Sequence, residues 1–415
     1  MAPDAQGAGQ PSGAEILRLV GLGALIGVPA ALAAAGFLAL VHELENGLWS
    51  GNPAWYLVVG LPVAGAALVV TARELLPGDG GHPPLEGLSA GLTPLSYAPG
   101  IVLAALGTLS FGAALGPEAP LIAIGSVAGL AVAALARLAP KEKAVLGSAG
   151  SFSAISALFG GPAVGGLLMI EGGLSMGTAL IPTLLPGFVA AAIGYVLFVG
   201  LGDWGGLSSQ PIAVPHLPAY GTTRVEDLLI AVAVGIVAAL IITMVRRGAG
   251  GLADKGPKRW GMPAVLLSGG LAVGLLAQVA DWLGADSQDV LFSGQAAIPD
   301  VIATDTTKIV LVLLVAKAIA YGVSLGCGFR GGPVFPAIFL GVGVATLPIV
   351  WFDRSPTLAV AVGAAAGMTA TTKLILTPIV FAALLVGSRG VHTAPAAVLA
   401  AVAAWLTVAA TSPRG

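Results

Sequence analysis

Two ten-residue stretches decide the fold of this chain: GPEAPLIAIG at residues 116–125 and GPVFPAIFLG at residues 332–341. Both follow the pattern G-P-x-x-P-x-I-x-[I/L]-G, and they lie 216 residues apart. The same offset aligns three further pairs, Gly112 with Gly328, Gly147 with Gly363 and Pro162 with Pro378. Because prolines coincide as well as the abundant glycines, the pattern indicates an internal repeat.

The composition around these stretches is that of a membrane protein. Of the 415 residues, 57% are hydrophobic and 9% are charged, and the mean hydropathy is +0.96, whereas about a quarter of a soluble domain is charged. Uncharged stretches such as 46–72 and 87–117 exceed the roughly 20 apolar residues of one spanning helix, and others are too short to span. With 61 glycines, 29 prolines and no alternating strand pattern, the sequence predicts an all-α polytopic membrane protein with many tilted and broken helices.

The repeat divides the chain into two membrane halves joined by a polar segment. Residues 203–222 are polar and proline-rich and read as a linker. Basic residues gather at 137–143 and 246–259, which places these segments in the cytoplasm by the positive-inside rule. The expected organisation is a disordered tail at 1–14, a first repeat at 15–202, the linker at 203–222, a second repeat at 223–411 and a tail at 412–415.

Each Gly-Pro pair marks the start of a helix that begins partway through the membrane. Proline suits the first turn of a helix, where its missing N–H costs nothing. The free N–H groups of a helix N-terminus, worth roughly half a positive charge, attract anions without a full cation. Paired Gly/Pro breaks in two halves are typical of a transporter binding site. The sequence therefore predicts an anion site at the two opposed helix starts.

Glu118 is the only ionisable residue between Glu86 and Arg137. An isolated carboxylate within the membrane is costly and by default functional. One interpretation is a helix cap, since acidic residues are favourable in a first turn. The other is a gate: the ionised carboxylate occupies the anion pathway, and on protonation or rotation it leaves the pathway open.

At these residues the chain resembles the CLC family of chloride channels and proton/chloride exchangers, over essentially residues 15–411. Gly116, Pro117, Glu118, Ala119 and Pro120 match the family's G-R-E-G-P signature, with Glu118 on the gating glutamate, and Gly332, Pro333, Val334, Phe335 and Pro336 match its G-x-F-x-P with the aromatic displaced by one. A further signature falls more weakly on Gly80, Gly81, His82 and Pro83, with Gly80 replacing the pore serine. The resemblance implies a multi-pass inner (plasma) membrane protein whose anion pathway includes these residues, and a homodimer.

The departures from the family keep two transport modes open. The resemblance places a proton-transfer glutamate where this chain has Gly172, so Glu171 lies one residue early for a proton route. This favours a channel-like pathway for chloride or a similar small anion, with a proton-coupled antiporter as the alternative. The family's tyrosine hydroxyl from the last helix is also missing, because no tyrosine follows Tyr321.

Other charges and other function classes carry less weight. Arg330, Lys317 and Lys373 could each concentrate anions near the pathway or serve packing alone. The net charge of -2 excludes nucleic acid as the main partner, and no pair of histidines and no cysteine cluster has metal-ligand spacing. Without a nucleophile-elbow context for its serines, an intramembrane enzyme is a remote alternative, as is a structural membrane subunit. No cofactor is expected.

Overall fold

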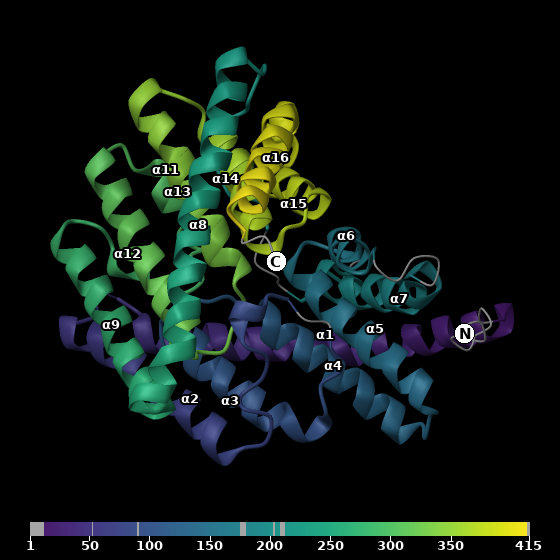
Figure 1. Cartoon of the computed structure of the whole chain (residues 1–415). Coiled ribbons are helices and arrows are strands. Elements are labelled where there is room, and N and C mark those ends of the chain that lie inside the picture. Colours follow the sequence, from purple (N-terminus) through teal and green to yellow (C-terminus); the bar gives the residue numbers. More distant parts are fainter. Residues whose placement is uncertain are drawn as a thin grey trace, which may run out of the picture. The chain divides into compact units, whose positions relative to one another are not determined.

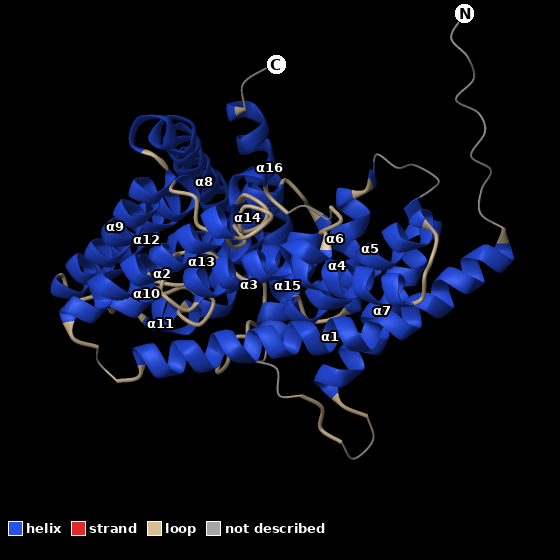
Figure 2. Ribbon diagram, turned by 90° about the horizontal axis from the view of Figure 1, so that it is seen from below, coloured by secondary structure: helices blue, strands red, loops and turns tan. Residues whose placement is uncertain are grey.

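The computed structural model describes residues 12–51, 53–88, 91–174, 180–201, 204–207 and 212–412. In these ranges the regular elements are helices (Figure 2), joined by loops and two isolated backbone bridges. The α-helices are α1 Gly13–Trp49, α2 Trp55–Leu75, α3 Ala98–Leu109, α4 Glu118–Leu135, α5 Pro140–Leu158, α6 Pro162–Gly172, α7 Leu180–Val199, α8 Val225–Trp260, α9 Met262–Trp282, α10 Ser287–Val290, α11 Ile298–Ala303, α12 Thr307–Gly326, α13 Val334–Phe352, α14 Pro356–Thr372, α15 Leu376–Val386 and α16 Ala394–Thr411. Short 3-10 turns include η1 Pro84–Glu86, η2 Leu95–Tyr97 and η4 Gly387–Thr393.

The helices have the mixture of lengths that the sequence predicts. In the described part of the chain, eight candidate spans are long and apolar enough to cross a membrane, and shorter apolar helices lie at Leu95–Leu109, Pro162–Gly172 and Leu184–Val199. The prediction of an all-α polytopic membrane protein is confirmed.

The repeat appears in the helix boundaries themselves. Helix α4 begins at Glu118 and α13 at Val334, directly after the two Gly-Pro pairs. The next helices of the two repeats, α5 and α14, begin at Pro140 and Pro356. Each pair of starts is separated by 216 residues. Gly112 and Gly328, a further pair at this offset, both have positive φ angles, 92° and 96°, which favour glycine because a Cβ is strained there. The internal repeat is therefore a repeat of structure.

The described chain forms two compact units, which we describe separately. The first comprises Met1–Ala34, Gly91–Thr93 and Ile124–Ser209. In it α5 packs against α6 and α7, and the Phe152 and Phe188 rings meet edge to face at 5.1 Å. Helices approach closely at Gly125, where a Cβ would lie 2.3 Å from the Gly150 carbonyl oxygen.

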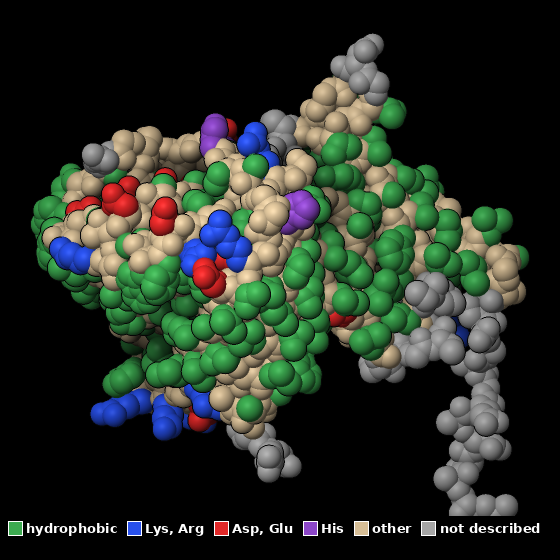
Figure 3. Space-filling model, turned by 90° about the horizontal axis from the view of Figure 1, so that it is seen from above, with side chains coloured by type: hydrophobic (Ala, Val, Ile, Leu, Met, Phe, Trp, Pro, Cys, Tyr) green, Lys and Arg blue, Asp and Glu red, His purple; other side chains and the backbone are tan. Residues whose placement is uncertain are grey.

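The second unit comprises Ala35–Ala90, Pro94–Ala123 and Gln210–Gly415. Helix α14 lies against α13, α8 and α16, and α2 lies against α9 and α3 (Figure 1). Gly341, the equivalent of Gly125, also packs closely on another helix, since its Cβ would lie 2.1 Å from the Gly363 carbonyl oxygen. On the face drawn in Figure 3, hydrophobic side chains cover most of the area and charged ones gather in a few groups.

The predicted tails and linker lie partly outside the described residues. Residues 1–11, 203, 208–211 and 413–415 are not described, and α1 begins at Gly13. The described part of 212–222 is not helical and is held by two backbone hydrogen bonds. Val214 N–H donates to the Leu385 carbonyl, and Tyr220 N–H donates to that of Arg389, both at 2.9 Å.

Candidate functional site

The two Gly-Pro motifs meet in the second unit. Gly116 and Gly332, equivalent residues of the two repeats, form an isolated antiparallel bridge. Gly116 N–H donates to the Gly332 carbonyl at 2.8 Å, and Gly332 N–H donates to the Gly116 carbonyl at 2.5 Å. The pair exchanges both bonds, as a local two-fold relation between the repeats requires. It brings the starts of α4 and α13 to one place.

The Glu118 carboxylate lies at this meeting point. Its side chain is fully buried, and Oε1 accepts a hydrogen bond of 2.9 Å from the Phe335 N–H at the start of α13. The N–H groups of Val334 and of Glu118 itself also attract the negative charge of the carboxylate. Oε2 is buried without a hydrogen-bond partner. A negative group from one repeat thus sits at the helix N-terminus of the other, where the helix dipole favours it.

Glycines lie on both sides of this carboxylate. A Cβ on Gly332 would lie 1.5 Å from Oε2 of Glu118, and a Cβ on Gly116 would lie 2.3 Å from the same atom. A side chain at either position would therefore displace the carboxylate from its present place. The carboxylate occupies space that the two glycines leave open beside the paired backbone.

Apolar residues and the Tyr321 hydroxyl surround the two helix starts. Phe335 is buried and meets Phe381 edge to face at 6.1 Å, and Ala119 is buried in the first turn of α4. Pro117 precedes α4 and Pro333 is the N-cap of α13. The Pro333 carbonyl accepts a hydrogen bond of 2.8 Å from the Tyr321 hydroxyl, a contact that the sequence gives no reason to expect.

The Gly80–His82 loop is joined to the second motif through Arg330. The Arg330 side chain donates from Nε to the Asp79 carbonyl at 2.9 Å and pairs with the Asp79 carboxylate. Arg73 also binds that carboxylate, at 2.7 and 3.0 Å. A Cβ on Gly80 would lie 3.2 Å from Arg73 Cγ and 3.3 Å from Arg330 Cγ. Arg330 is thus buried and carboxylate-bound, a tie between the loop and the Gly331–Gly332 turn.

His82 points a free nitrogen into the protein beside this loop. Its Nδ1 lies 3.6 Å from the Glu86 carboxylate, and its Nε2 is buried without a hydrogen-bond partner. Burial lowers the pKa of the His82 imidazole, opposed by Glu86 and reinforced by the Arg330 charge. A neutral ring with one unsatisfied nitrogen remains a candidate contact for a ligand.

The remaining sequence candidates lie elsewhere. Glu171 is half-buried near the end of α6, in the first unit, whereas Glu118 lies in the second. Lys317 is fully buried, and its ammonium donates to the carbonyls of Asp289, Leu291 and Phe292 at 3.1, 2.5 and 3.0 Å. Lys373 is exposed at the C-cap of α14. Lys317 therefore holds a loop, and neither lysine contacts Glu118.

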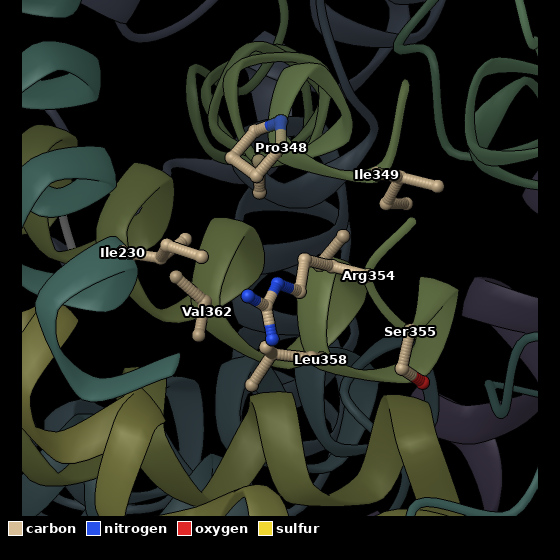
Figure 4. Close-up of a pocket in the computed structure, with 9 residues that line it drawn as sticks. Ile230, Pro348, Ile349, Arg354, Ser355, Leu358 and Val362 are labelled. Carbon is tan, nitrogen blue, oxygen red and sulfur yellow. The ribbon is translucent and has the colours of Figure 1, made fainter. Parts of the chain in front are cut away.

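A separate small pocket lies between α13, α14 and α8 (Figure 4). Its volume of about 10 Å³ suits a single water molecule. Arg354 Nε and Ser355 Oγ are buried without partners, but the Arg354 guanidinium already pairs with Glu226 and Asp227. Two carboxylates neutralise this arginine, so the pocket is a poor place for an anion. Among the described residues no group of histidines, cysteines and carboxylates has the geometry of a metal site.

Comparison of the whole chain with known proteins identifies its family. The profile described as "Voltage gated chloride channel" matches residues 85–408 of this chain. The chain belongs to this family, the CLC family. The ion-transport protein YfeO of Escherichia coli (strain SMS-3-5) is 28% identical over 364 residues, which cover 80% of each chain. The protein of the same name from Shigella boydii serotype 4 matches with the same identity and coverage.

Two solved structures share the CLC fold. A slow cyanobacterial Cl⁻/H⁺ antiporter superposes with a TM-score of 0.74 at 16% identity, over 93% of this chain and 94% of the other. A CLC-type fluoride/proton antiporter superposes with a TM-score of 0.71 at 19% identity, over 95% and 96%. As a CLC protein with eight candidate spans in its described part, the chain is a multi-pass protein of the inner (plasma) membrane that transports anions.

Proposed function

We propose that this CLC protein conducts chloride or a similar small anion along a path that runs past the starts of α4 and α13, with Glu118 as its gate. One observation carries the proposal. The Glu118 carboxylate, itself an anion, is held by the Phe335 N–H over the paired glycines Gly116 and Gly332. A site that binds an internal carboxylate through backbone N–H groups has the chemistry to bind a free anion in its place.

The proposed anion contacts follow from this geometry. Val334 and Phe335 offer N–H groups at the start of α13, and the glycines leave the space that the anion needs. Pro117 and Pro333 donate no N–H but fix the two helix starts. Gly80, Gly81 and His82 form one approach to the site, held by Arg330. Because the donors are backbone dipoles rather than a buried cation, the anion can leave quickly, as conduction requires.

A proton-coupled antiporter is the second candidate. The two solved structures compared above are described as antiporters, one for chloride and one for fluoride. Coupling would need a second proton-transfer group, and Glu171 is the candidate in this chain. The channel-like reading rests on Gly172, where the resemblance expects that glutamate.

The partners follow from this proposal. They are chloride or another small anion, possible protons in the coupled mode, the lipid bilayer and a second copy of the chain. A transport role rather than an enzymatic one agrees with the family, and the mechanism needs no cofactor. The mass of the detergent-purified protein from light scattering tests the homodimer; a monomer mass at working concentrations would reject it.

Simultaneous chloride and pH recording from proteoliposomes tests the transport mode. A chloride gradient is imposed while potassium and valinomycin clamp the voltage. We expect chloride flux without proton movement. Chloride flux that drives protons uphill would replace the channel with an antiporter, and the same recording on Glu171→Gln would then test the proton route. Absence of flux for both chloride and fluoride would reject the proposed function.

A further inference from the structure

A line of polar side chains runs from the Pro333 carbonyl to an arginine on another helix, all within the second unit. The Tyr321 hydroxyl of α12 lies 2.8 Å from the Pro333 carbonyl oxygen and 3.5 Å from Oγ1 of Thr371 on α14. The same Thr371 oxygen lies 3.3 Å from a guanidinium nitrogen of Arg246 on α8. Tyr321 is fully buried and Thr371 is 6% exposed.

The donor and acceptor roles in this line are fixed by proton counting. Tyr321 has one hydroxyl hydrogen, and the Pro333 carbonyl can only accept, so Tyr321 donates to Pro333. Thr371 must then donate to the Tyr321 oxygen, and Arg246 donates to Thr371. Every hydrogen bond therefore points the same way, from the guanidinium toward the carbonyl. The link between the two hydroxyls is long and is the weakest of the three.

The line ends on the carbonyl of a peptide unit whose N–H is one of the proposed anion donors. The carbonyl of Pro333 and the N–H of Val334 belong to the same peptide unit, and Val334 is the first residue of α13, next to the Phe335 N–H that binds the Glu118 carboxylate. A hydrogen bond accepted by a peptide carbonyl makes the N–H of that peptide a stronger donor, because hydrogen bonds in a chain polarise one another. Tyr321 thus affects the anion site through the Pro333 carbonyl, on the opposite side of the peptide from the N–H that faces the anion.

The other end of the line carries an uncompensated charge. In the described part of the chain, Arg246 has no carboxylate within 4 Å, and its second recorded contact is to the Leu85 carbonyl in η1 at 2.8 Å. This contrasts with Arg73, Arg330 and Arg354, which all pair with carboxylates. The Arg246 charge is therefore available to polarise the hydroxyls, and it lies near enough to act on Tyr321 directly.

We infer that Tyr321, Thr371 and Arg246 form a hydrogen-bond relay that polarises the Pro333–Val334 peptide and so strengthens anion binding at the start of α13. Tyr321 and Arg246 are positioning residues of the site in this view. The inference rests on the proposed function for its effect on the anion, but its effect on the peptide can be measured without transport.

Solution NMR reads the peptide directly. Labelling proline carbonyls with ¹³C and valine nitrogens with ¹⁵N selects the two Pro-Val pairs of the sequence, Pro62–Val63 and Pro333–Val334. In Tyr321→Phe, which keeps the ring and removes the hydroxyl, we expect the Val334 amide proton to move upfield while the Val63 signal stays in place. An unmoved Val334 signal would overturn the relay whether or not the protein transports chloride.

Calorimetry measures the effect of the relay on chloride affinity. It is done in a Glu118→Gln background, which removes the carboxylate charge that competes with chloride. The lost hydrogen bond in Tyr321→Phe should raise the chloride Kd about three- to tenfold. Thr371→Val should raise it less, because it breaks the weakest link. Thr369→Val, two residues earlier on α14, is the matched control, since the Thr369 hydroxyl is buried without a partner. An unchanged Kd in both Tyr321→Phe and Thr371→Val would contradict the relay.

A double-mutant cycle separates the relay from a simple field effect. Arg246→Gln should raise the chloride Kd, whereas the exposed neighbour Arg247→Gln should not. If the charge acts through the hydroxyls, Arg246→Gln has a smaller effect in the Tyr321→Phe background. Fully additive effects would show that Arg246 acts through space alone and would overturn the relay. No chloride binding in any variant would instead reject the proposed function and leave the Val334 signal to decide the relay.

Discussion

At the scale of single residues, the site depends on a carboxylate that stands where an anion would stand. Glu118 is fully buried and receives the Phe335 N–H on one oxygen, while the other oxygen has no partner. A simple helix cap would satisfy its own helix. Beyond the N–H of its own residue, this carboxylate reaches the helix start of the other repeat, which favours the gating interpretation over the capping one.

Replacing Glu118 by glutamine tests the gate. In the wild type we expect chloride flux to increase as the pH falls, because protonation removes the negative charge that competes with the anion. Glu118→Gln should give a flux that does not change with pH, with the protein still folded. Flux measured from proteoliposomes across a pH series checks this, with the exposed Glu74→Gln as control. A pH profile unchanged by Glu118→Gln would remove the residue from the mechanism.

Adding one methyl group at Gly332 tests whether the carboxylate and the anion use the same space. Gly332→Ala places a Cβ 1.5 Å from the present Oε2, and overpacking of this kind costs about 1–3 kcal/mol. We expect chloride flux to fall about tenfold or more. In Gly332→Ala/Glu118→Ala the flux should stay low, because the methyl group excludes the anion itself. Recovery of flux in the double variant would mean that the anion passes elsewhere. Gly60→Ala is the control, because a Cβ at Gly60 meets no atom within 4 Å.

At the scale of elements, the loop between α9 and α12 is organised by one buried cation. Lys317 on α12 donates to the carbonyl of Asp289 in α10 and to those of Leu291 and Phe292 just after it, and its ammonium lies 4.9 Å from the centre of the Phe339 ring on α13. The charge therefore serves to join a loop to two helices. From the sequence alone, a lysine in an apolar run is equally consistent with a charge on the anion pathway and with a structural role. Only its contacts in the folded protein distinguish these two roles.

Removing this ammonium should destabilise the protein rather than alter anion selectivity. Lys317→Met leaves buried carbonyls without a donor, which should lower the free energy of unfolding by at least about 2 kcal/mol. The exposed Lys373→Met should have little effect. Thermal unfolding of both purified variants measures the difference. Equal melting temperatures would show that the three carbonyls do not depend on Lys317.

The same loop should make stability depend on pH. Burial, reinforced by Asp286 and Asp300 and opposed by Lys317, raises the pKa of Asp289 to about 7 from its ordinary value of 3.8. The folded chain therefore holds this proton more tightly than the unfolded chain, and the stability gained is full below about pH 4 and lost as the pH rises through about 7.

Asp289→Asn removes this titration. We expect the variant and the wild type to melt alike near pH 4, and the variant to melt at a higher temperature at pH 8. Melting curves across this range check the sign, with the exposed Asp305→Asn as control. A variant that melts below the wild type at pH 8 would contradict the expected cost of ionising Asp289.

At the scale of the whole molecule, the repeat sets the helix starts and places a close helix contact at an equivalent glycine in each half. A Cβ at Gly125 would lie 2.3 Å from the Gly150 carbonyl in the first unit, and one at Gly341 would lie 2.1 Å from the Gly363 carbonyl in the second. Gly125 and Gly341 are equivalent at the offset of 216, whereas Gly150 aligns with Ala366 and Gly363 with Gly147. Each unit therefore depends on a close approach at the equivalent glycine, made to carbonyls about one helical turn apart in the two repeats.

Alanine at either equivalent glycine should be similarly harmful. We expect Gly125→Ala and Gly341→Ala each to lower the melting temperature, because backbone atoms must shift to admit the methyl group. Gly60→Ala should leave it unchanged or raise it slightly, since alanine favours an open helix position by about 0.5–1 kcal/mol. Parallel melting curves of the three variants give the comparison. A neutral effect in only one of the two repeats would show that the equivalence does not extend to packing.

The sequence could predict the helix starts at Glu118 and Val334, because proline after glycine has a local meaning. It could not predict that Glu118 binds Phe335 or that Gly116 pairs with Gly332, since both contacts depend on how the two repeats meet. Tyr321, Thr371 and Arg246 carry no local signal at all. They lie on three helices and come together only through the packing of α8, α12 and α14.

The reciprocal pairing of Gly116 with Gly332 also limits how fast and by what motion the path can open. Two backbone hydrogen bonds join the Gly116 and Gly332 segments beside the carboxylate, so widening the path there would break both at once. Rotation of the Glu118 side chain breaks only its own contacts. Rotamer changes of exposed side chains take picoseconds to nanoseconds, whereas collective backbone motions take microseconds to milliseconds. Glu118 is fully buried, so its rotation is slower than that of an exposed side chain, but it leaves the backbone bridge intact. The elementary opening event in this protein should therefore be a rotamer change beside an intact backbone bridge.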